Sequence, residues 1–229
     1  MPHHRLVLLA LVVPLALSAC GGGADNERSA DPAGVLSAEA LDDALLQSGS
    51  TVGDAEVGPE DLPGLADDRV ADPEACQPLS AIVDLDPEPV RSERVQAKTP
   101  RLGPWVNVQL LTYADDDAEQ VFALVEDALE ACAGGFAEDR VRDVAIKIVV
   151  PESVSDRGDE ATAYATVSTE VDEADPVETI EHMVLVRDGQ QLLSFRAASA
   201  GDDGGARALL AAVVDAQWKR YADREAPGH

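Results

Sequence analysis

Hydrophobic positions along the chain follow helical spacing in some stretches and strand-like alternation in others. Apolar residues at steps of three and four predict helices over residues 38–47, 115–132 and 202–222. Alternating or short apolar runs predict strands over residues 105–113, 144–150, 161–169, 179–187 and 190–197. Residues 48–59 are small and polar, so a loop is expected there. Pro151 is expected to end the strand over residues 144–150. Helix, strands, helix, strands and helix in this order indicate an α+β domain.

The helix over residues 115–132 has the clearest pattern. Acidic residues stand at its start, where the helix dipole favours negative charge, and Gly134 and Gly135 follow its end. One apolar face carries Ala118, Phe122, Val125, Leu129 and Cys132. The inner flank of the closing helix carries Leu210, Val213, Val214, Gln217, Trp218 and Tyr221. We expect an antiparallel twisted sheet with these two long helices packed on one face.

Asp188-Gly189 predicts a hairpin between the last two strands, because this dipeptide favours the turns that match strand twist. A two-residue loop at these positions places Arg187 opposite Gln190. Glu181 then stands opposite Arg196, and the two are expected to form a cross-strand ion pair.

The N-terminus has the pattern of a bacterial lipoprotein signal. An apolar run over residues 6–17 is long enough for a signal peptide and shorter than the about 20 residues of a membrane-spanning helix. It ends in Leu17-Ser18-Ala19-Cys20, which predicts removal of residues 1–19 and lipidation of Cys20. A buried core helix, or an ordinary signal peptide that leaves Cys20 unmodified, is the alternative.

This signal divides the chain into a signal peptide (1–19), a lipidated cysteine with a flexible tether (20–36), a domain (37–222) and a disordered tail (223–229). The net charge is −27, which disfavours nucleic acid and anionic lipid headgroups as partners. The expected partner is therefore the lipid bilayer, reached through acylated Cys20. The expected location is the extracytoplasmic face of the cell membrane, and an unidentified small ligand or envelope protein is a further candidate partner.

Besides Cys20, the chain contains Cys76 and Cys132. Two thiols in an oxidising compartment predict one disulfide, and Cys132 lies on the inward face of its helix, where it can reach Cys76. The bond would close a loop of about 57 residues, which the chain-entropy model values at about 4 kcal/mol. A pair of free buried cysteines is the alternative.

Motifs for catalysis and cofactor binding are missing from the sequence. It contains no Gly-x-Ser-x-Gly, Walker or Gly-x-Gly-x-x-Gly pattern, and no cofactor is predicted. His182 lies in a predicted strand and is interpreted as a satisfied, half-buried histidine. Asp84, Asp86 and Glu88 alternate as a calcium site could, but they lack the EF-hand pattern and are interpreted as a solvated acidic edge. Neither a catalytic residue nor a metal site is predicted.

One strand carries a row of hydroxyl groups. Thr162, Tyr164, Thr166 and Ser168 alternate with small apolar residues, so they share one face of the sheet. They are the predicted lining of a ligand site, if one exists; a merely solvated sheet face is the alternative.

The arrangement of these elements resembles a known family. Cys76 precedes an extended region, an apolar strand follows at residues 106–111, and a helix reading Asp-Ala-Glu-Gln-Val-Phe at residues 117–122 ends in Ala-Cys at residues 131–132. This order is similar to the PknH-like extracellular sensor domain of mycobacterial serine/threonine kinases and of free actinobacterial lipoproteins. The resemblance covers about residues 37–221 and implies a helix-backed sheet with a small-ligand cleft. The family typically has a second disulfide, which this chain lacks.

These observations predict a cell-surface lipoprotein with a non-catalytic domain that is sensor-like or binds a small ligand. Three rivals remain at this point. A carrier of an apolar envelope lipid requires a deep apolar cavity, and an envelope enzyme requires clustered carboxylates or His182 in a concave site. A partner-binding protein requires a flat apolar patch.

Overall fold

The computed structural model describes residues 34–60, 69–82, 84–100, 103–139, 144–170, 178–200 and 203–224. The predicted signal peptide, Cys20 and residues 21–33 of the predicted tether lie outside the described residues, as do residues 225–229 of the predicted tail. The last residues of the predicted tether contact the domain. The Leu36 N–H donates a hydrogen bond to Thr112 Oγ1 at 3.1 Å, and Gln191 Nε2 donates to the Gly34 carbonyl oxygen at 2.9 Å.

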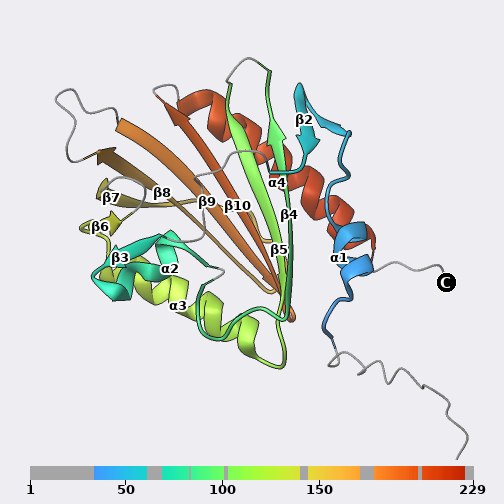
Figure 1. Cartoon of the computed structure of the whole chain (residues 1–229), viewed down its shortest axis with the longest axis horizontal. Helices are drawn as coiled ribbons and strands as arrows, with labels where there is room; N and C mark the ends of the chain where they lie inside the picture. The colour runs from blue at the N-terminus through green and yellow to red at the C-terminus, as the bar shows by residue number, and fades with distance from the viewer. Residues whose placement is uncertain are drawn as a thin grey trace, which may run out of the picture. The chain divides into compact units, whose positions relative to one another are not determined.

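An antiparallel sheet dominates the described part of the chain, in the order β1-β2-β4-β5-β10-β9-β8-β7-β6-β3 (Figure 1). Its strands are β1 (Thr51–Val52), β2 (Ala55–Gly58), β3 (Val70–Asp72), β4 (Arg91–Lys98), β5 (Trp105–Thr112), β6 (Phe136–Asp139), β7 (Val144–Glu152), β8 (Glu160–Glu170), β9 (Glu178–Asp188) and β10 (Gln191–Ala200). The helices are α1 (Ala38–Ala44), α2 (Gln77–Ser80), α3 (Asp117–Ala131) and α4 (Asp203–Asp223), with a 3-10 turn η1 (Glu74–Cys76) before α2. The predicted α+β class and antiparallel sheet are confirmed.

Helices cover both faces of this sheet, which corrects the expectation that the two long helices share one face. Leu110 and Leu193 belong to the core that contains Val213 of α4, whereas Leu111 and Leu192 belong to the core that contains Phe122 of α3. Because successive strand residues point to opposite faces, α4 and α3 lie on opposite sides. We call these the α4 face and the α3 face.

The physical reason is that the central strands are apolar on both faces. Val184, Leu185 and Val186 are all buried on β9, as are neighbouring residues on β5 and β10. A strand that must be covered on both sides does not keep the strict apolar–polar alternation of a half-exposed strand.

Several strands were absent from the sequence prediction. The expected loop over residues 48–59 contains the small hairpin β1–β2, in which Val52 stands opposite Ala55. β4 has exposed polar residues over much of its length, and the short strands β3 and β6 pair with each other. Asp84, Asp86 and Glu88, expected on an extended strand, are exposed residues outside the strands.

The β9–β10 hairpin forms, but its register differs from the prediction. Asp188 pairs with Gln191, so the loop residues are Gly189 and Gln190, and Arg187 stands opposite Leu192. Gly189 has φ +57° and occupies the first central position, as glycine does in type II′ turns. The predicted ion pair still forms: Arg196 Nη2 donates to Glu181 Oε2 at 2.6 Å, as a diagonal neighbour rather than a directly opposed one.

The predicted disulfide between Cys76 and Cys132 is confirmed. Its Cα atoms are 5.9 Å apart, and both residues are buried in the core of the α3 face. The bond ties η1 to the C-cap of α3. None of the helices in the described part of the chain is long and apolar enough to cross a membrane.

Candidate ligand-binding cavity

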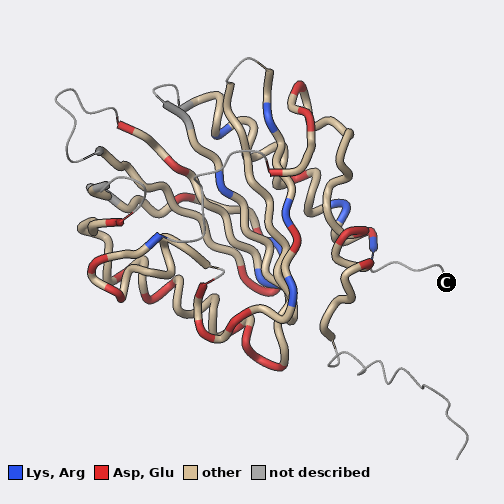
Figure 2. The backbone as a smooth tube through the Cα atoms, viewed as in Figure 1, with Lys and Arg blue, Asp and Glu red and all other residues tan. Residues whose placement is uncertain are grey.

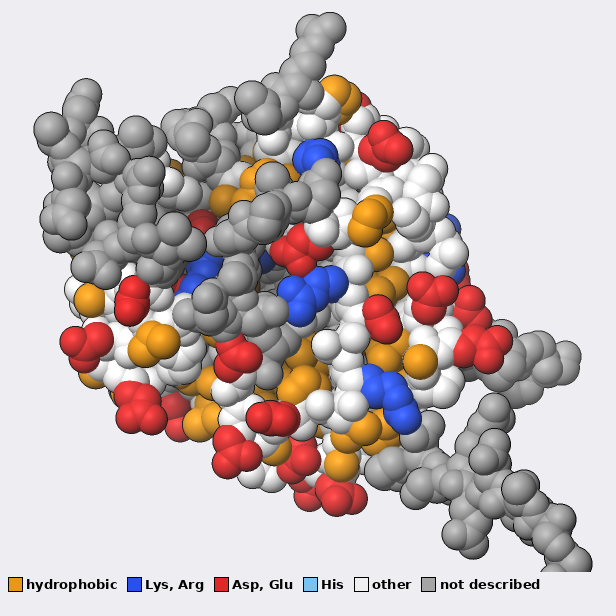
Figure 3. All heavy atoms as spheres, viewed as in Figure 1, with side chains coloured by type: hydrophobic (Ala, Val, Ile, Leu, Met, Phe, Trp, Pro, Cys, Tyr) orange, Lys and Arg blue, Asp and Glu red, His pale blue; other side chains and the backbone are white. Residues whose placement is uncertain are grey.

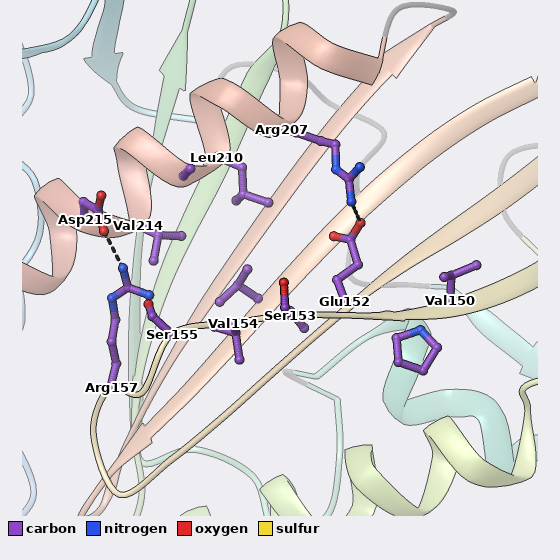
Figure 4. A pocket seen from close by; sticks show the side chains of 14 residues that line it. Val150, Glu152, Ser153, Val154, Ser155, Arg157, Arg207, Leu210, Val214 and Asp215 are labelled. Carbon is purple, nitrogen blue, oxygen red and sulfur yellow. Dashed lines mark hydrogen bonds and ion pairs between the residues drawn. The ribbon is translucent and has the colours of Figure 1, made fainter.

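A cavity of about 500 Å³ lies on the α4 face, between α4 and strands β7, β8 and β9. This volume falls within the range of about 300–1,000 Å³ that is usual for small-molecule sites. Its lining comprises Val150, Pro151, Glu152, Ser153, Val154, Ser155, Arg157, Ala163, Val184, Arg207, Leu210, Ala211, Val214 and Asp215. Figure 4 shows α4 above the opening and the segment after β7 below it.

The strand-side wall exists because β7 continues past Pro151, which corrects the expectation that this proline ends the strand. Pro151 pairs with Tyr164 and Glu152 with Ala163 of β8, whereas β6 pairs with β7 only as far as Ile146. Proline is tolerated where one side of a strand has no ladder partner. The extension places Glu152 at the edge of the cavity.

Glu152 joins three elements at one end of the cavity. Its Oε2 lies 3.1 Å from Nδ1 of His182 on β9, and its Oε1 accepts a hydrogen bond from Nη2 of Arg207 on α4. The His182 side chain is 2% exposed, so a buried imidazole ring contacts the Glu152 carboxylate from the sheet. The expected satisfied histidine is therefore fully buried rather than half-buried, and it positions Glu152.

A second ion pair closes the other end of the cavity. Arg157, from the charged turn before β8, donates from Nη2 to Oδ1 of Asp215 on α4. The Arg157 side chain is 15% exposed, whereas that of Asp215 is 70% exposed. In the Glu152–Arg207 pair, the side chains are 14% and 54% exposed, respectively. Each pair thus has an inner member on the sheet side and an outer member on the helix.

The lining between the two pairs is mainly apolar, with Ser153 and Ser155 as its polar members. Val154, Leu210 and Val214 lie between the labelled charged residues in Figure 4, and Ala163 and Val184 complete the lining from the strands. Arg207 and Asp215 are eight residues apart on one helix, which corresponds to about 12 Å along its axis. The cavity therefore has an elongated, mainly apolar centre with a charge pair at each end.

The predicted hydroxyl row lies on the other side of the sheet. Tyr164 belongs to the α3-face core, where its hydroxyl donates to the Leu79 carbonyl oxygen at 3.3 Å. Thr166 and Ser168 are buried and Thr162 is partly exposed. None of the four lines the cavity, and a ligand contact for them stays a prediction.

A buried ionic cluster lies beside Tyr164 on this α3 face. Arg69 Nη1 is 3.5 Å from Glu138 Oε1 and 3.5 Å from Glu181 Oε2, while Arg196 binds both carboxylate oxygens of Glu181. Among the described residues, two arginines therefore face two carboxylates, and opposite charges are how buried charges are normally accommodated. Burial raises the pKa of Tyr164, which keeps its hydroxyl protonated beside this cluster.

Acidic residues dominate the surface of the α3 side. Figure 2 shows acidic positions along α3 and the turns beside it, and Figure 3 shows their side chains along the lower border of the same view. Among the described residues, no group of three or more His, Cys, Asp or Glu is arranged to hold a metal ion. The charged groups with a cavity between them are those of the α4 face.

Sequence reasoning did not identify the cavity residues. Arg157 lies between the predicted strands 144–150 and 161–169, and no local signal links it to Asp215, 58 residues later. One usable signal was present on the closing helix. Arg207, Ala211 and Asp215 recur at steps of four, which places two opposite charges at the ends of one helix stripe.

Comparison with solved structures identifies a shared fold. The chain is similar to the extracellular domain of PknH from Mycobacterium tuberculosis, with a TM-score of 0.52 and 15% sequence identity. The match covers 81% of this chain and 98% of that domain, in agreement with the resemblance noted in the sequence. No protein-family model matches the chain, and no curated protein matches its sequence.

Proposed function

We propose that this chain is an extracytoplasmic lipoprotein whose domain binds a small ligand without catalysis, in the manner of a sensor. The observation that carries the proposal is the cavity of about 500 Å³ between α4 and the sheet, with its mainly apolar lining and paired charges. An apolar pocket with a few polar groups is the usual form of a small-molecule site. The shared fold with an extracellular domain supports the location.

The ligand-binding part is tested with a matched pair of helix variants. Ala211 lines the cavity and Ala212 does not, although both are exposed on α4. Native mass spectrometry of the protein purified from its own envelope is expected to show a bound small molecule. Ala211→Trp is expected to remove it and Ala212→Trp to retain it. Equal occupancy in both variants, or no bound mass in the unaltered protein, would count against the cavity.

The anchoring part is tested separately at Cys20. The thiol of Cys20 would receive a diacylglyceryl group, and several acyl chains hold a protein stably on a bilayer. Cys20→Ser is expected to abolish metabolic acyl labelling and membrane fractionation of the protein. An unaltered protein that carries no acyl group would overturn the anchor and leave the cavity unaffected.

A further inference from the structure

We propose that the cavity binds an elongated zwitterion with an apolar middle, specifically a short apolar peptide of about three or four residues with free ends. This inference rests on the proposed ligand-binding function and names the class of ligand. The peptide's ammonium group binds Glu152, and its terminal carboxylate binds Arg157.

The first step is the unequal exposure within each ion pair. Glu152 and Arg157 are 14% and 15% exposed, whereas their helix partners Arg207 and Asp215 are 54% and 70% exposed. An ion pair with a solvated partner contributes little, because water competes for the exposed group. A ligand can therefore replace each outer partner at small cost, while the inner partner stays in the cavity.

The second step is that the inner partners have opposite signs. Glu152 offers a carboxylate at one end, held in place by His182 at 3.1 Å, and Arg157 offers a guanidinium at the other. A ligand with one charge would satisfy one end only, and a ligand with two like charges would meet repulsion at one of them. A ligand with a cation at one end and an anion at the other pairs with both Glu152 and Arg157.

The third step is the length and chemistry of the space between them. Each inner group contacts an outer partner, and the outer partners Arg207 and Asp215 are about 12 Å apart along α4. An extended peptide rises about 3.3 Å per residue, so three or four residues span this distance. Val154, Leu210 and Val214 between the ends favour apolar side chains on the peptide. Ser153 and Ser155 line the same stretch and offer hydroxyl groups to the peptide backbone.

The ligand class is tested by calorimetric titration of the purified full-length processed protein with the tetrapeptide Ala-Leu-Leu-Ala. The same peptide is also used with an acetylated amino end or an amidated carboxyl end. Blocking either end is expected to weaken binding about tenfold or more, since the blocked end can no longer form its ion pair with the partly buried Glu152 or Arg157. For the Glu152→Gln protein, acetylating the peptide should cause no further loss of affinity. For the Arg157→Gln protein, amidating the peptide should likewise cause no further loss.

The two members of each ion pair are expected to respond in opposite directions. Arg207→Gln and Asp215→Asn remove groups that compete with the ligand's ends, so both should bind the free peptide about two- to fivefold more tightly. Purely structural ion pairs would make all four substitutions weaken binding.

Decanoate and decylamine are titrated in parallel as ligands with a single charged end. Binding of either one without the peptide would overturn the zwitterion and leave a ligand cavity in place. Weak or absent peptide binding by the folded protein would also overturn it. The Ala211→Trp and Ala212→Trp comparison decides the cavity itself independently.

Discussion

Gln217 of α4 donates a hydrogen bond of 2.8 Å from Nε2 to the carbonyl oxygen of Ala44 at the end of α1. Its Oε1 accepts the N–H of Leu46 at 2.9 Å, so one side-chain amide satisfies two backbone groups. Gln217 is fully buried. This contact joins the first and last helices of the domain on the α4 face.

Replacing Gln217 with leucine is expected to lower the free energy of unfolding by about 2–4 kcal/mol, because two buried backbone groups lose their partners. Denaturant titration measures this change. Gln120→Leu is the control, since Gln120 is exposed on α3 and should change stability by less than about 0.5 kcal/mol. Similar stability for both variants would contradict the role of Gln217.

Two buried tyrosines are expected to respond differently to loss of their hydroxyl groups. The Tyr113 hydroxyl is buried and has no hydrogen-bond partner among the described residues, whereas that of Tyr221 contacts Asp188 at 3.0 Å and Gln191 at 3.2 Å. Tyr113→Phe should leave stability unchanged or increase it, and Tyr221→Phe should reduce it by about 1 kcal/mol. Thermal unfolding of the two variants side by side measures the difference; an equal loss in both would refute it.

The sequence indicated the elements better than it indicated their arrangement. The apolar stripes of α3 and α4 and the central strands follow local periodicity, which depends on each segment alone. The side of the sheet that each helix covers depends on packing between distant segments. Leu110 and Leu111, both buried on β5, were the available sign that the sheet needs cover on two faces.

The register and the cavity depended on details that local patterns do not determine. Asp188-Gly189 and Gly189-Gln190 are both acceptable hairpin loops, and the structure uses the second. Glu152 lies one residue past a proline that normally ends strands, and Arg157 meets a residue on a helix far along the chain. The pairing of Cys76 with Cys132 was predictable because the chain offers no other cysteine apart from Cys20.

Alkaline pH is expected to unfold the domain as its tyrosines ionise. Burial raises the pKa of Tyr113, Tyr164 and Tyr221, which are the three tyrosines of the chain. An unfolded tyrosine loses its proton at about pH 10. Below pH 10 the three tyrosines are protonated in both the folded and the unfolded protein, and the stability that they contribute is complete. As pH rises further, the unfolded chain releases protons first, so stability falls.

Tyrosinate absorbance and circular dichroism, followed together in one pH titration, measure this coupling. The two signals are expected to change at the same pH, above the value for the protein unfolded in guanidinium. Tyrosinate formation near pH 10 with the fold retained would show that the side chains are accessible and would contradict the buried arrangement.

Removing the disulfide is expected to lower the free energy of unfolding by about 2–5 kcal/mol, because the unfolded chain regains the freedom of the open loop. Chemical denaturation of Cys20→Ser protein with and without reductant measures the loss. Thiol titration of the oxidised, denatured Cys20→Ser protein should find no free thiol. Two free thiols would show that Cys76 and Cys132 are not bonded.

Glu181 and Arg196 are expected to be strongly coupled, because the Glu181 side chain is 7% exposed and that of Arg196 is 13% exposed. Removing one partner leaves the other charge buried, so Arg196→Met and Glu181→Leu should each cost about 3–5 kcal/mol. The double variant should cost much less than the sum of the two single losses, since it removes both charges together.

A matched cycle on Arg94 and Glu60 is the control, because the Arg94 side chain is 41% exposed. This cycle should give a coupling free energy of less than about 1 kcal/mol. Equal coupling in the two cycles would mean that burial does not govern the Glu181–Arg196 pair, and additive losses would mean that the contact itself contributes nothing.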